Sequence, residues 1–105
     1  MPSVAVLERN DAPIDRSLFE RVRESGQAAA RIAERLPAIL ADPALSIDAL
    51  YKLIVGIDTR RTESERIVQE AENAENPRLL SLAQQVERLW ATLASKAAER
   101  ARRNH

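Results

Sequence analysis

The stretch that decides the fold is NAENPRLLSLAQQVERLWATLASKAAERARR, residues 73–103. Asn76 is a favourable helix N-cap, and Pro77 suits the first helical position, where no backbone N–H is needed. Large apolar residues then recur at three- and four-residue intervals, which predicts one face of an amphipathic helix over residues 77–102. The seam of this face consists of Leu79, Leu82, Val86, Leu89 and Leu93, and a second row of Leu80, Ala83, Trp90, Ala94 and Ala97 widens it.

The residues before this turn predict a second long helix, over residues 44–74, that starts at Asp42-Pro43 or at Ser46. Its apolar seam runs from Ile47 to Ile57 and resumes at Ile67. Residues 58–66 between them contain no large apolar side chain, but they contain no Gly or Pro either. One continuous helix is therefore the simpler prediction. The short connection at Asn76 makes this helix an antiparallel neighbour of the helix over 77–102.

A third helix is predicted over residues 17–36, where Ser17 and Glu20 form a capping box. Its seam consists of Leu18, Val22, Ser25, Ala29, Ile32, Leu36 and Ile39. Pro37 removes a backbone donor, so we expect it to end or kink this helix near residues 34–36. The sequence Asn10-Asp11-Ala12-Pro13 disfavours regular structure. Residues 1–14 are therefore predicted to form an extended or disordered arm, and residues 15–105 a single domain.

The composition favours self-association. Of the 105 residues, 45% are hydrophobic and 30% are charged. Alanine accounts for 18 of the hydrophobic residues, whereas aromatic residues make up only 3% of the chain. Alanine buries little area, so each helix pair gains less than a leucine-rich pair would. The sequence predicts an all-α fold, an antiparallel three-helix bundle with a long hairpin, completed by homodimerisation. We place the dimer contact on the seam of the helix over 77–102 and part of the first helix.

Catalysis and metal binding find little support in the sequence. There is no cysteine, and the only histidine is the terminal His105, so no serine has an obvious general base. The glutamates of residues 63–75 have arginines nearby, which lower a carboxylate's pKa and make it a poor general acid. No metal-ligand spacing and no glycine-rich phosphate loop occurs. We therefore predict a protein that is not an enzyme and that binds no cofactor and no metal.

The sequence predicts a cytoplasmic bacterial protein. It contains no segment long and apolar enough to cross a bilayer, and its N-terminus lacks the features of a secretory signal. The absence of cysteine fits a reducing compartment. Arginine outnumbers lysine 14 to 2, which is typical of a GC-rich bacterial genome.

The polar stretch of residues 58–66 has two interpretations. Counting outward from the two turns places Arg61 near Trp90 and Arg60 near Gly26. In the structural interpretation, glycine makes room while an arginine stem packs on the indole. In the functional one, Arg60, Arg61 and Trp90 form a ligand or partner site. The sequence leaves both open.

The function that fits best is protein–protein association, as an assembly, adaptor or chaperone-like factor, with itself and with another protein as partners. The alternative is a small nucleic-acid-associated regulator that uses the basic end formed by Lys96, Arg100, Arg102 and Arg103. Two observations disfavour this alternative. The 16 basic and 16 acidic residues balance, and basic residues at a helix C-terminus also complement the helix dipole.

Overall fold

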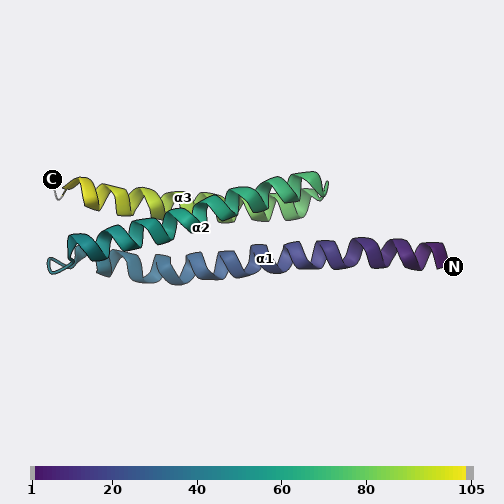
Figure 1. Cartoon of the computed structure of the whole chain (residues 1–105), viewed down its shortest axis with the longest axis horizontal. Coiled ribbons are helices and arrows are strands. Elements are labelled where there is room, and N and C mark those ends of the chain that lie inside the picture. Colours follow the sequence, from purple (N-terminus) through teal and green to yellow (C-terminus); the bar gives the residue numbers. More distant parts are fainter. Residues whose placement is uncertain (1, 104–105) are drawn as a thin grey trace.

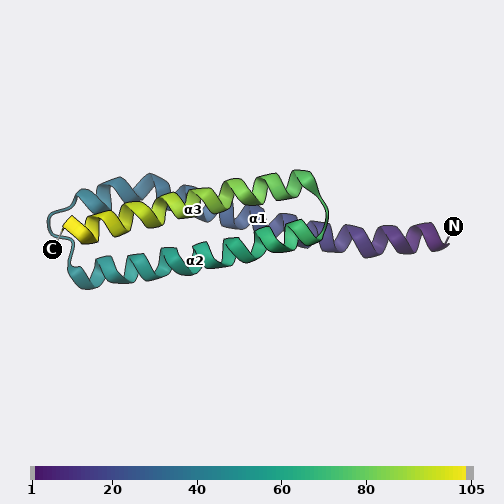
Figure 2. The ribbon, with the colours of Figure 1, turned by 90° about the horizontal axis from the view of Figure 1, so that it is seen from above.

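The computed structural model describes residues 2–103, and the side chains of residues 17–103. All regular structure in this part of the chain is helical: α1 (Pro2–Ala41), α2 (Ile47–Asn73) and α3 (Pro77–Arg103). α2 and α3 form an antiparallel hairpin with the most extensive helix contact, and α1 packs along one face of it (Figures 1 and 2). The predicted all-α class is confirmed. The molecule measures 65 × 19 × 18 Å, and its radius of gyration of 17.7 Å exceeds the roughly 13 Å of a compact chain this long.

The ends of the hairpin helices follow from local capping. Ser46 is the N-cap of α2, and its side chain accepts a hydrogen bond from the Ala49 backbone N–H at 3.1 Å. Asn76 caps α3, since its Oδ1 accepts from the Leu79 N–H at 3.2 Å. Glu75, in the turn before it, has the left-handed φ of 57°. α2 runs unbroken through residues 58–66, so the predicted single helix is confirmed, with Ser46 as the starting cap.

The N-terminal part of α1 differs from the predicted extended or disordered arm. The helix begins at Pro2 and passes through Ser17, which is therefore no N-cap. Figures 1 and 2 show its first turns projecting beyond the α2–α3 turn, with no other helix beside them. A capping box is a local pattern and does not exclude a helix that continues upstream. Asn10, Asp11 and Pro13 are poor helix formers, and Pro13 removes a backbone hydrogen bond, so α1 continues here against the local preference of the sequence.

The C-terminal end of α1 also differs from the prediction, because the helix continues past Pro37 to Ala41. Pro37 is exposed. Contacts outside α1 hold the helix on both sides of Pro37: Leu36 before it is almost fully buried, and Arg100 Nε donates to the Leu40 carbonyl after it at 2.8 Å. These contacts offset the one hydrogen bond that proline removes.

The core consists of two apolar clusters along the rod. The cluster near the α1–α2 turn contains Ala28, Ala29, Leu36, Ile57, Trp90, Leu93 and Ala97. The cluster near the α2–α3 turn contains Leu18, Val22, Ile67, Ala71, Leu79 and Ala83. Val86 packs against both clusters. All three helices contribute to each cluster, so α1 is an integral part of the bundle.

Candidate functional site

An open groove lies between α1 and α3. It has a volume of about 520 Å³, and its lining consists of Gly26 from α1 and Leu82, Gln85, Val86, Arg88, Leu89 and Thr92 from α3. Leu82 is 41% exposed and Leu89 is half-buried. At Gly26, an added Cβ atom would lie 3.2 Å from Val86 Cγ2. The absence of a side chain there allows α1 and α3 to approach closely and keeps the groove open.

The structure divides the predicted interaction seam between the core and this groove. Leu79 and Leu93 are 4% and 3% exposed and belong to the two core clusters. Leu82, Val86 and Leu89 line the groove. The core of α3 instead includes Ala83, Trp90 and Ala97, which the sequence places in the second row. The part of the predicted surface that remains accessible is therefore the groove face.

Trp90 is fully buried, and its partner comes from α1. The indole Nε1–H donates to Ser25 Oγ at 2.9 Å. Arg61 pairs along its own helix, with Asp58 at 3.4 Å and Glu65 at 3.6 Å, and Arg60 is exposed. Sequence analysis placed Ser25 on the α1 seam but did not identify it as the indole's partner. The polar group that satisfies the indole is thus a serine, and the structure gives Trp90 a core position.

One ion pair joins α1 to α2, and sequence analysis did not find it. Arg21 donates two hydrogen bonds to Glu70, at 2.8 and 2.7 Å. These bonds hold the pKa of the Glu70 carboxyl below its ordinary value and raise the pKa of Arg21. Both side chains are about 40% exposed, so solvent screens the pair and its contribution to stability is modest. The pair bridges α1 and the hairpin.

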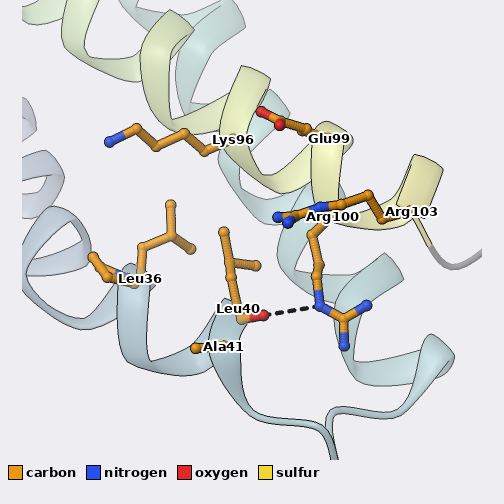
Figure 3. A pocket seen from close by; sticks show the side chains of 8 residues that line it. Leu36, Leu40, Ala41, Lys96, Glu99, Arg100 and Arg103 are labelled. Atoms are coloured by element: carbon orange, nitrogen blue, oxygen red, sulfur yellow. Dashed lines mark hydrogen bonds between the residues drawn. The ribbon is translucent and has the colours of Figure 1, made fainter.

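The basic end of α3 lines a second groove, also of about 520 Å³, with the last turn of α1 (Figure 3). In it, Arg100 reaches across to the Leu40 carbonyl. Lys96, Arg102 and Arg103 are exposed. Arg100 therefore holds two helix ends together, and a nucleic-acid role for these four basic residues stays a prediction.

The described residues offer neither a metal-binding cluster nor a membrane span. Among the side chains of residues 17–103, no group of three or more histidine, aspartate or glutamate residues is arranged to hold a metal ion. No helix within residues 2–103 combines the length and the apolar character that a membrane span requires. His105 lies outside the described residues.

No protein-family model matches the chain, and no curated protein or solved structure is detectably similar to it.

Proposed function

We propose that this protein is a non-catalytic helical adaptor that binds an amphipathic helix of another protein in the α1–α3 groove. The observation that carries the proposal is that Leu82 is exposed and Leu89 partly exposed, on either side of the close approach at Gly26. Helix-in-groove recognition uses apolar anchors at helical spacing. Leu82 and Leu89 lie seven residues apart and so repeat on one face of α3.

The groove is suited to a helix because its floor is rigid. Val86 lies between the two leucines and packs against both core clusters, so it cannot move without disturbing the bundle. A preformed floor reduces the ordering that binding requires. Arg88 is exposed at the rim, which favours a partner helix with an acidic flank.

Photo-crosslinking from a single position tests this proposal. A benzophenone amino acid replaces Leu82 in one variant and Gln84 in a control variant, both expressed in the native host. Gln84 is partly exposed on the same helix and lies about 200° around its axis from Leu82, outside the groove lining. We expect a discrete protein adduct from position 82 that is absent from position 84, and Leu89→Ala should weaken it. No adduct at position 82, or the same adducts from both positions, would contradict the proposal.

A further inference from the structure

A row of large apolar side chains on α2 faces solvent. Ile47 is 72% exposed, Tyr51 67% and Val55 49%, and they follow one another at four-residue intervals. This row is here called the α2 stripe. Single exposed apolar residues are ordinary on a protein surface, but three consecutive ones on one helix face form a patch that indicates an interaction site.

The α2 stripe lies on the face of the hairpin that α1 leaves uncovered. Glu70 marks the side of α2 that faces α1, because it binds Arg21. Gly56 lies two heptads before Glu70 and therefore on that same side. Tyr51 is five residues before Gly56, which places it about 140° around the helix. Figure 1 shows α1 on one face of the hairpin and no helix on the other.

The same uncovered face of α3 carries alanines. Ala98 is two residues from both Lys96 and Arg100, which line the groove toward α1, so it lies about 200° around α3 from them. The face is formed by Ala91, Ala94, Ala98 and Ala101, each partly exposed. Small side chains let a second helix come close to α3. The uncovered face therefore combines large apolar side chains on α2 with a flat surface on α3.

We propose that a second copy of this chain docks on this face, antiparallel to the first, with a two-fold axis beside Tyr51. This inference goes beyond the proposed adaptor function and uses the opposite side of α3. The spacing is self-complementary, because an axis at Tyr51 sets Ile47 of each copy opposite Val55 of the other. An isologous contact of this kind closes at two copies.

The charges beside the α2 stripe fit the same axis. Asp48 and Lys52 border the stripe and form an ion pair of 3.3 Å within α2. Their midpoint is residue 50, one residue from the proposed axis. In an antiparallel pair the same flank of each helix faces its symmetry mate, so Asp48 of each copy lies beside Lys52 of the other. A partner with a different charge order would not gain this reciprocal pairing.

Disulfide trapping tests the axis directly, since the chain contains no cysteine of its own. Tyr51→Cys should form an intermolecular disulfide under mild oxidation. Ile47→Cys alone should not, because its symmetry mate lies about 12 Å away along the helix. A mixture of Ile47→Cys and Val55→Cys should cross-link. Phe19→Cys, at a 44% exposed residue of α1, is the control for random collision.

A charge exchange tests the choice of partner. Asp48→Lys gathers four cations at the axis and should weaken the dimer about tenfold. The double variant Asp48→Lys/Lys52→Asp restores opposite charges and should restore the dimer. Light scattering after size exclusion, over an about hundredfold concentration range, measures the mass, and circular dichroism checks that each variant is folded.

Three results would overturn the proposed dimer: a monomer at every concentration, equal cross-linking at positions 19 and 51, or an unchanged dimer in the Asp48→Lys variant. Failure of the adaptor function is separate from these. Leu82→Ala should leave the dimer intact, and Tyr51→Glu should leave the photo-adduct at position 82 intact, because the two surfaces lie on opposite sides of α3.

Discussion

Gly26 and Gly56 both lie inside helices, but their surroundings differ. A Cβ atom at Gly56 would meet nothing within 4 Å, whereas one at Gly26 would lie 3.2 Å from Val86 Cγ2. Glycine inside a helix destabilises by about 0.5–1 kcal/mol relative to alanine. We therefore expect Gly56→Ala to raise the free energy of unfolding by about that amount, measured by urea denaturation.

Gly26→Ala is the matched variant for this measurement. At Gly26 the same gain in helix propensity is offset, because an added Cβ atom would displace Val86. Val86 packs against both core clusters. Overpacking of this kind destabilises by about 1–3 kcal/mol, so Gly26→Ala should be neutral or destabilising. An equal gain from both variants would show that α1 and α3 do not approach closely at Gly26.

The Arg21–Glu70 pair predicts a pH dependence of stability. Hydrogen bonds from Arg21 lower the pKa of Glu70 in the folded protein, while the unfolded value is about 4.3. The unfolded state therefore binds the proton more readily. The stabilisation is fully present above pH 4.3 and is lost as the pH falls through the lower, folded value. Arg21 stays charged throughout and contributes no change of its own.

Glu70→Gln checks this sign. At pH 7 we expect a loss of less than about 1 kcal/mol, because both side chains are partly exposed. Near pH 3 the variant and the wild type should approach each other in free energy of unfolding. Glu20→Gln, which removes only the pair between Glu20 and Arg23 one turn away on α1, is the control. A difference at Glu70 that grows on acidification would contradict the assignment.

At the scale of the elements, the hairpin could be predicted because its signals are local. Ser46 and Asn76 act as caps within three residues of themselves. The length of α1 could not be predicted in the same way. Whether a helix passes through Pro37 depends on neighbours far along the chain, such as Arg100, which binds the carbonyl of Leu40. Tertiary contacts override local stop signals there.

The rotation of α3 about its axis was the hardest feature to predict. Leu82 and Leu89 are larger than Ala83 and Ala97, so a hydrophobicity pattern favours the leucine row as the core. In the bundle, α3 contacts both α1 and α2, and the small side chains of Ala83 and Ala97 fit this crowded interior. The leucines are displaced to the groove. The sequence could thus predict which residues belong to the candidate site. Which of them remain accessible depends on how α3 packs against α1 and α2.

The exposed surface of α2 was missed for a related reason. Ile47 belongs to the same predicted seam as Leu50 and Ile57, but it is 72% exposed while they are 2% and 1% exposed. Around the helix, Ile47 lies about 60° from Leu50 and about 80° from Ile57. It therefore falls outside the core face that Leu50 and Ile57 define.

At the scale of the whole molecule, the stability of the rod should reside in residues 17–103. Both apolar clusters lie within this range, and the first turns of α1 project beyond the hairpin (Figures 1 and 2). Because these turns are helical but lie beside no other helix, deletion of residues 1–16 should remove helical signal in circular dichroism, while the free energy of unfolding changes by less than about 0.5 kcal/mol.

Leu18→Ala is the reference variant for the loss of free energy of unfolding. Leu18 is 4% exposed in the cluster near the α2–α3 turn, so its truncation should destabilise the protein by about 2–5 kcal/mol. The deletion should also leave the proposed dimer unchanged. Tyr51 lies near the α1–α2 turn, at the opposite end of the rod from the projecting helix. If the deletion destabilised as much as Leu18→Ala, the projecting turns would have to make stabilising contacts in the folded protein. If the deletion also converted a dimer to a monomer, those contacts would be with a second copy, and the two-fold axis would have to lie at that end of the rod.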